Sequence, residues 1–410
     1  MRFLLLLVLT AAAATTAAQV DTLVPTITCW SRDTVEGITL PAPASVVDGT
    51  AAMNSVFDVV FTDSVPAEAK ASIQFAADVW GSYLQSEVPI RVEVDWQDKE
   101  DDRILASAGP SAIYRTFPGA IDPQVWYPVA LAEAIVGEDL NDAEDPDIVV
   151  QVNSTANWNF ATTGSVPRNK IDLSSVILHE FGHGLGFLSS IDSTSDSTLS
   201  IGFDERYIIY DLFLETPAGL SLADTASFRS PSEELLAAVI DRLEFSGDSA
   251  VAKNGKELVP LFAPATFDIG SSVSHLDERT YRAGSPNALM TPSIAAGEAA
   301  RDPGPVTLGI LFDLGWPLRF EVVSTRFQVI ADRLSIFPNP ASDRFTVELE
   351  ADAAPVQAIL YAPDGREVRR QAISVSARRA EINVSGLTPG IYTLLLPDQD
   401  RAFTGRVMVQ

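Results

Sequence analysis

The chain has 410 residues, enough for two or three domains, and 46% of them are hydrophobic against 20% charged. This balance is typical of a globular protein and excludes a disordered one. The formal net charge is −27, and nucleic acids or anionic membrane surfaces would repel such a chain, so we expect neither as its main partner.

The N-terminus has the pattern of a secretory signal. Arg2 precedes a short apolar run, and small residues at Thr16 and Ala18 suit cleavage before Gln19. We therefore predict a signal peptide over residues 1–18. The apolar run is too short to span a bilayer, and no later segment approaches that length, so we expect no transmembrane segment in the mature chain.

Residues 19–50 have little periodic pattern and several prolines, and we interpret them as an N-terminal leader or pro-segment. An alternation of strand and helix signals follows. It predicts strands at 55–61 and 90–94 and, between them, a helix from Pro66 to about Ser86.

Two acidic loops interrupt this pattern, at 97–103 and 137–147. The second could hold a structural calcium ion, because carboxylates and carbonyls suit hard cations, but it lacks a recognisable ligand spacing and a solvated acidic loop is the simpler interpretation. A further strand is predicted at 147–152, and the next helix should begin after Asp172 as its N-cap.

The pattern changes beyond about residue 317. Short alternating runs separated by turn signals predict a small all-β sandwich over 335–410, with strands at 345–349, 356–361, 380–384, 391–396 and 403–409. Residues 320–334 would form a linker. The predicted fold class is thus an α/β (α+β) domain over 51–319, followed by a β-sandwich.

The predicted helix after Asp172 carries the sequence HEFGH. His179 and His183 are four residues apart, so on a helix they project from one face and can share a metal ion. Glu180 follows the first histidine directly and could accept a proton from a metal-bound water. Gly186 could adopt the left-handed conformation that ends a helix.

A chance match on a buried helix is the competing interpretation of this motif. The histidine supply weighs against it, because the chain has three histidines and two of them occupy the motif. A catalytic zinc site needs three protein ligands and one open position. The remaining histidine, His275, is the candidate third ligand.

The motifs HEFGHGLGF, SHLDE and ALMTP, in this order, resemble those of the metzincin zinc metalloproteases, especially the leishmanolysin-like branch. The resemblance covers about residues 50–318. Most metzincins have the third ligand three residues after the glycine, where this chain has Ser189, whereas an insertion before His275 is similar to the leishmanolysin-like arrangement. The resemblance further implies that Met290 forms a Met-turn beneath the zinc and that 306–314 is a helix.

From this resemblance we expect a metzincin-like fold and a secreted endopeptidase that hydrolyses peptide bonds of proteins or peptides. One catalytic Zn²⁺ would be held by His179, His183 and His275, with Glu180 as general base. The substrate would lie extended along an edge strand, which we assign to 147–152.

Two residues have open roles. Tyr281 is a candidate for stabilising the oxyanion, because the chain lacks a tyrosine just after the Met-turn. Cys29 could supply a thiolate to the zinc in a latent precursor, as pro-segment cysteines do in some metzincins, or it could be an inert, partly buried thiol. Its surroundings match no activation motif, which favours the inert thiol.

The C-terminal region has a resemblance of its own. The segments FPNPASD and LTPGIY, at 337–343 and 387–392, resemble those of the C-terminal sorting domain of type IX secretion substrates. This implies the type IX secretion machinery as a partner, passage through the outer membrane, and a secreted or cell-surface protein.

Two other functions stay open at this point. One is a cell-surface binding protein or adhesin on an inactive protease fold, which the complete set of motif residues disfavours. The other is a zinc aminopeptidase with a carboxylate as third ligand, which the pairing of His275 with Met290 disfavours.

Overall fold

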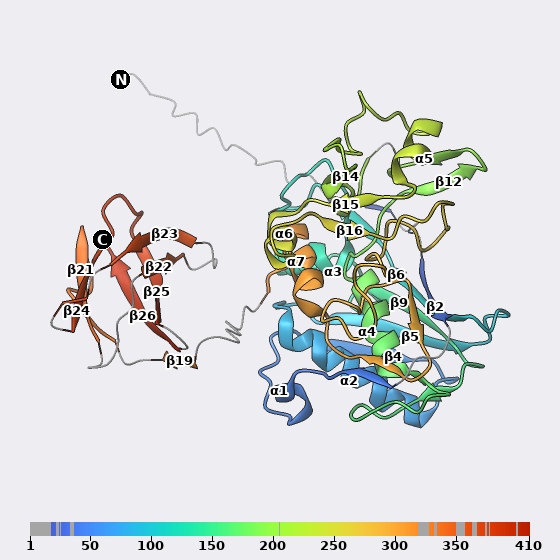
Figure 1. Ribbon diagram of the computed structural model, residues 1–410, viewed down its shortest axis with the longest axis horizontal. Coiled ribbons are helices and arrows are strands. Elements are labelled where there is room, and N and C mark those ends of the chain that lie inside the picture. The colour runs from blue at the N-terminus through green and yellow to red at the C-terminus, as the bar shows by residue number, and fades with distance from the viewer. Residues whose placement is uncertain are drawn as a thin grey trace, which may run out of the picture. The chain divides into compact units, whose positions relative to one another are not determined.

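The structure is a computed structural model, and it describes residues 18–410 except 22–23, 25, 33–36, 205, 319–327, 332–333, 350–356, 363–366, 374, 377 and 399–400. The chain divides into two compact units, residues 1–319 and 320–410 (Figure 1). The larger unit mixes helices and sheets and the smaller one consists of strands, so the chain belongs to the mixed α+β class.

The larger unit is built around a six-stranded sheet with the order β17-β2-β6-β9-β5-β4. Its strands are β4 (Phe57–Phe61), β5 (Ile90–Gln97), β9 (Ile148–Asn153), β6 (Ile104–Pro110), β2 (Ile27–Arg32) and β17 (Ser293–Ala295). β4, β5 and β9 run parallel, β6 runs antiparallel to both β9 and β2, and β17 runs parallel to β2.

Two long helices, α2 (Ala67–Tyr83) and α4 (Leu173–Gly184), pack against each other and against this sheet (Figure 1). The apolar stripe expected on α2 is buried, with Ile73 and Trp80 fully inaccessible. Trp80 also donates its indole N–H to the carbonyl of Leu178 on α4, 2.9 Å away. The two helices are therefore joined at the level of the histidine motif.

Shorter elements complete the larger unit. They are β1 (Gln19–Asp21), β3 (Ile38–Leu40), α1 (Ala44–Val47), β7 (Ile113–Arg115), β8 (Tyr127–Pro128), α3 (Val129–Val136), β10 (Trp158–Asn159), β11 (Ile171–Asp172), β12 (Asp192–Ser195), β13 (Thr198–Ser200), the 3-10 helix η1 (Ile209–Phe213), β14 (Leu214–Glu215), α5 (Glu233–Val239), β15 (Leu243–Phe245), α6 (Asp248–Lys253), β16 (Val259–Leu261), β18 (Glu298–Ala300) and α7 (Gly304–Leu314).

The helices and strands predicted between residues 55 and 314 are confirmed to within a few residues, but the role given to 147–152 is wrong. β9 lies inside the sheet, where β5 and β6 take up its backbone hydrogen bonds on both sides, so it offers no free edge to a substrate. Residues 19–50 also differ from the unpatterned leader that we expected. They contribute β2 to the main sheet, and β3 pairs with β18.

The smaller unit has two sheets. One has the order β19-β26-β25-β22-β23 and the other β20-β21-β24. Their strands are β19 (Gln328–Ala331), β20 (Ser335–Phe337), β21 (Arg344–Glu348), β22 (Gln357–Tyr361), β23 (Glu367–Ala372), β24 (Arg379–Asn383), β25 (Gly390–Asp398) and β26 (Arg401–Val409). Phe345 and Ile382 from one sheet share a buried core with Leu394 and Phe403 from the other. This is the predicted sandwich arrangement.

Two predicted segments remain, the signal peptide and the linker. The signal peptide, residues 1–18, lies outside the described residues apart from Ala18. Of the expected linker 320–334, the described part includes β19, which pairs in parallel with β26, so at least this part is a strand of the sandwich. Among the helices in the described ranges, none has the length and apolar character needed to cross a membrane.

Candidate metal centre

Helix α4 positions the histidine motif. Asp172 caps its N-terminus by accepting a hydrogen bond from the backbone N–H of Ser175, as the sequence predicted, and all twelve helical residues are buried. Gly186 has φ +117°, the left-handed region expected there, and it turns the chain away from the helix. On a helix buried on all sides, a polar side chain without a partner is costly.

Three imidazoles meet at one point above this helix. The Nε2 atom of His179 lies 2.9 Å from Nε2 of His183 and 3.2 Å from Nε2 of His275. In a tetrahedral site with zinc–nitrogen bonds of about 2.0–2.1 Å, neighbouring nitrogens would be about 3.3 Å apart. The structure thus brings together the three histidines that the sequence selected, at a spacing that suits three ligands of one ion.

The other nitrogen of each ring contacts a backbone carbonyl. Nδ1 lies 2.7 Å from the carbonyl oxygen of Leu289 in His179, of Phe187 in His183 and of Ser271 in His275. A carbonyl can only accept, so Nδ1 must carry the proton, and in a neutral ring Nε2 then presents a lone pair. Three lone pairs facing one another repel unless a cation lies between them.

Burial keeps these rings neutral. It lowers the pKa of His179 to about 4 and those of His183 and His275 well below the usual value, and mutual repulsion between the rings adds to the lowering for the latter two. Neutral imidazole is the form that binds transition metals. The three rings are therefore in the form that can ligate a metal ion at neutral pH.

Met290 lies directly against the helix at the histidine motif. A Cβ atom added to Gly182 would lie 2.7 Å from the Met290 sulfur, so only glycine permits this approach. The Met290 carbonyl accepts a hydrogen bond from the backbone N–H of Leu276, next to His275. Met290 thus packs beneath the site and joins the segment that carries the third histidine, without contributing a ligand.

The segment that carries His275 is held by long-range polar contacts, which no local sequence pattern reveals. Val273 has φ +71°, a costly conformation for a β-branched residue, and the hydroxyl of Tyr210 donates to its carbonyl. The backbone N–H of Ser189 donates to the hydroxyl of Ser274. Strain at this point is tolerated because the neighbouring contacts fix the backbone in place.

Asp211 fixes the turn that follows helix α4. Its buried carboxylate accepts hydrogen bonds from the hydroxyls of Ser189 and Ser190 and from the backbone N–H of Ser190 and Ile208. Ser189, the residue at the usual metzincin ligand position, is therefore committed to Asp211. Buried carboxylates with this many donors are a feature that a sequence pattern does not reveal.

Glu180 has a buried carboxylate, and neither of its oxygens has a hydrogen-bond partner among the described residues. Burial raises its pKa well above the ordinary value, and the charge of Lys99 opposes that shift. A buried carboxylate without partners is costly unless a cation or a bound proton balances it. One of its oxygens lies within 4.8 Å of a ring nitrogen of His179, so the carboxylate borders the same site, where it could accept a proton.

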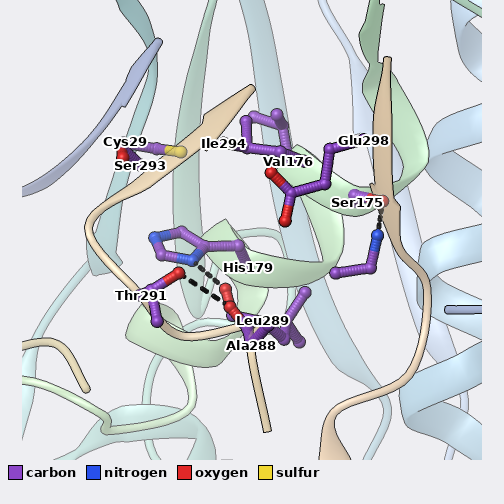
Figure 2. Close-up of a pocket in the computed structure, with 11 residues that line it drawn as sticks. Cys29, Ser175, Val176, His179, Ala288, Leu289, Thr291, Ser293, Ile294 and Glu298 are labelled. Carbon is purple, nitrogen blue, oxygen red and sulfur yellow. Dashed lines mark hydrogen bonds between the residues drawn. The ribbon is translucent and has the colours of Figure 1, made fainter. Parts of the chain in front are cut away.

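Cys29 approaches this site from strand β2. Its sulfur, a ring nitrogen of His179 and a carboxylate oxygen of Glu180 all lie within 4.8 Å of one another. Burial raises the pKa of the thiol, and so does the charge of Glu180. Figure 2 shows the small cavity beside it, which Cys29, His179 and Glu298 help to line. The interpretation as a buried thiol fits, but the thiol is next to the metal centre.

The other candidates lie elsewhere. The hydroxyl of Tyr281, the candidate for stabilising the oxyanion, donates to Asn254, 2.7 Å away. In the acidic loop considered for calcium, Asp147 accepts hydrogen bonds from Arg91 and Asn141. Within the described ranges, the groups with converging ligand atoms are the three histidines and the cluster of Cys29, His179 and Glu180.

Known protein families match two parts of the chain. A family described as "Secretion system C-terminal sorting domain" matches residues 335–410, and one described as "SPBPB7E8-like" matches residues 42–214. No curated protein matches the chain. The smaller unit is thus a type IX sorting domain, which directs export to the cell surface or the medium and implies contact with that secretion machinery.

Two solved structures are similar to small parts of the chain. A single mutant of a thermostable endoglucanase from Alicyclobacillus acidocaldarius is 24% identical over 18% of this chain and 15% of its own, with a TM-score of 0.15. The sulfur carrier protein SoxY from Chlorobium limicola f. thiosulfatophilum is 11% identical over 20% of this chain and 84% of its own, with a TM-score of 0.16. The chain therefore spans only a small part of the endoglucanase.

Proposed function

We propose that the larger unit is a zinc-dependent endopeptidase of the metzincin type. The observation that carries the proposal is the convergence of the three Nε2 atoms, each with its lone pair fixed inward by a carbonyl on the opposite nitrogen. The motifs SHLDE and ALMTP support it further, because His275 and Met290 come from these two segments and both adjoin helix α4.

The histidines and Glu180 would have different roles in the reaction. His179, His183 and His275 would hold the ion, which when bound supplies a Lewis acid that polarises water and a peptide carbonyl. Glu180 would take a proton on its free carboxylate and later deliver it to the leaving amine. Burial raises the pKa of Glu180, and a cation at the three imidazoles would oppose that rise and favour the ionised carboxylate that can accept the proton.

The buried setting contributes to this chemistry. Glu180 and the three histidines are each at most 2% exposed, so charges that develop during the reaction are weakly screened by solvent. The carbonyl of Leu289 holds the His179 ring in its orientation, and Met290 packs against the same helix at Gly182. The rings therefore need little rearrangement when a metal or a substrate binds.

Hydrolysis of a mixed peptide library by the purified, zinc-supplied full chain tests the proposal, with Glu180→Gln as the matched control. Glutamine keeps the size of the side chain but cannot accept the proton, so we expect kcat/KM to fall at least about 100-fold. The zinc content should be unchanged, and a chelator should abolish the hydrolysis of the unaltered chain. Hydrolysis that persists in Glu180→Gln, or in excess chelator, would contradict the proposal.

A further inference from the structure

Strand β2 lies between two other strands of the main sheet. On one side it pairs antiparallel with β6, and on the other side parallel with β17. Backbone hydrogen bonds extend the pairing, from Trp30 to the carbonyl of Pro292 and from Ser31 to that of Arg103. Within the described ranges β17 has no other partner in this sheet, so residues 27–32 fill a slot whose two edges both offer backbone groups.

The slot lies next to the metal centre. Cys29 is the β2 residue that faces His179 and Glu180, and the carboxylate of Glu180 that points there has no partner of its own. An extended polypeptide in this slot therefore presents one residue to His179 and to the unpaired acid Glu180.

Arg32 occupies an acidic pair three residues further along the strand. Its guanidinium lies 2.7 Å from Glu298 Oε2 and 3.2 Å from Glu278 Oε1. Glu298 is 3% exposed, and its only other hydrogen-bond donor among the described residues is the backbone N–H of Ala295. A carboxylate buried this deeply is costly without a counter-charge, so the pair requires a cation whenever Arg32 is elsewhere.

We infer that the slot held by residues 27–32 is the groove in which a substrate polypeptide binds as an added strand, with Glu278 and Glu298 as the subsite for a basic side chain. That side chain would be the third residue C-terminal to the one that faces the metal centre. The inference rests on the proposed function, because it names the substrate class of the same site. The N-terminal segment is then an internal occupant that must leave before a substrate can enter.

The test uses the full chain with Glu180→Gln, so that bound peptides are not hydrolysed, and with a site-specific protease recognition sequence inserted after Arg32. Cutting turns the occupant into a separate, exchangeable peptide. Two labelled hexapeptides are compared by fluorescence anisotropy: Ile-Thr-Ala-Trp-Ser-Arg and its counterpart with a terminal alanine. Alanine replaces the cysteine in both, so that no thiol can bind the metal.

We expect the cut protein to bind the arginine peptide on the order of tenfold more tightly than the uncut protein binds it. The cut protein should also bind the arginine peptide on the order of tenfold more tightly than the alanine peptide. Glu298→Gln should remove the preference for arginine without altering binding of the alanine peptide. Equal affinities of the cut protein for the two peptides, or no binding of either, would overturn the inference.

Cutting could also unfold the unit, which near-ultraviolet circular dichroism would reveal. In that event the intact chain with Glu180 restored is compared as Arg32→Ala and Arg32→Lys. Hydrolysis of peptides that contain arginine should rise on the order of tenfold in Arg32→Ala and much less in Arg32→Lys, which keeps the ion pairs. Equal rates in both variants and the unaltered chain would overturn the inference.

The two proposals fail in different ways. Peptide binding with the arginine preference, but no hydrolysis by the protein with Glu180 intact, would refute the endopeptidase and keep the groove. Hydrolysis that vanishes with Glu180→Gln, but shows no dependence on Arg32, Glu278 or Glu298, would keep the endopeptidase and refute the groove.

Discussion

Helix α4 and the segment 262–301 contribute to one site by opposite means. The helix is a regular element of twelve buried residues, and it brings His179 and His183 together by its own periodicity. The segment has only two short strands, β17 and β18, and it depends on distant partners such as Tyr210 and Asp172 to hold His275 and Arg301. The site therefore joins a half that local sequence determines to a half that tertiary contacts determine.

The two halves of the site should therefore respond differently to substitutions. A change in the helix acts on the ligands directly, because they are part of its repeating geometry. A change around the segment acts through hydrogen bonds and ion pairs that link residues far apart in the chain, such as the pair Asp172–Arg301, 129 positions apart.

The largest effect should come from removing a ligand of either half. His179→Ala and His275→Ala should each weaken zinc binding about 1,000-fold. This loss corresponds to roughly a third of the free energy with which a structural site binds zinc. Competition with a chromophoric chelator measures the affinity. The control is Asp192→Asn, an exposed acid near the end of the helix, which should bind zinc as the unaltered chain does. Normal zinc binding by His275→Ala would show that the third ligand is another residue.

The next effect concerns the ion pair that ties the two halves together. Arg301 donates to both carboxylate oxygens of Asp172, the N-cap of α4, and both side chains are at most 1% exposed. Arg301→Ala leaves a buried carboxylate unpaired, so the free energy of unfolding should fall by about 3–5 kcal/mol. Chemical denaturation of the larger unit measures it.

A matched comparison is Arg344→Ala, which breaks an ion pair with Glu381 on the surface of the smaller unit. Both of its partners are more than half exposed, so the unfolding of that unit should change by less than about 1 kcal/mol. A similar loss in both variants would mean that burial of the Asp172–Arg301 pair has no special importance.

The next prediction concerns the pH dependence of the free energy of unfolding, and it involves a residue outside both halves of the site. Burial, and then the charge of Asp147, raise the pKa of Glu133 on α3 to about 8 from an ordinary 4.5. The folded state therefore holds an extra proton between these values, and unfolding releases it, so stability should fall as the pH rises from about 4.5 to 8.

Glu133→Gln separates this contribution, because its amide oxygen can still accept from the backbone N–H of Leu140. Denaturation curves at several pH values should show a weaker decline for the variant across this window. An identical pH dependence in both proteins would contradict the raised pKa.

Among the changes around the site, the smallest effect should come from one support of the irregular half. Tyr210→Phe removes the hydroxyl that donates to the Val273 carbonyl and leaves the ring packing intact. We expect a loss of about 1 kcal/mol in the free energy of unfolding. Zinc affinity should weaken by less than about tenfold, because the histidine itself is untouched. A loss as large as that of His275→Ala would mean that Tyr210 alone holds the segment.

The sequence predicted the regular half of the site and most of the secondary structure around it. The spacing of His179 and His183, the cap at Asp172 and the turn at Gly186 are all local signals, and each has its expected place in α4 or directly beside it. His275 could be selected only by counting histidines and by resemblance, because no local pattern says which distant segments meet.

Strand order was the main point at which sequence reasoning failed. Residues 147–152 were correctly predicted as a strand, but their neighbours β5 and β6 are not encoded in their own alternation, so the assignment to an edge was wrong. The alternation of apolar and polar residues in 27–32 is weak, because Cys29 is the only apolar residue between Ile27 and Trp30. Their place beside the metal centre is determined by partners more than 70 positions away, which no local window contains.

X-ray absorption spectroscopy at the zinc edge, on the full chain loaded with one equivalent of zinc, tests the central claim most directly. The account predicts that three imidazole nitrogens surround the zinc at about 2.0–2.1 Å, and that one of them is lost in His275→Ala. A spectrum with fewer than three imidazoles in the unaltered chain, or no tightly bound zinc at all, would contradict it.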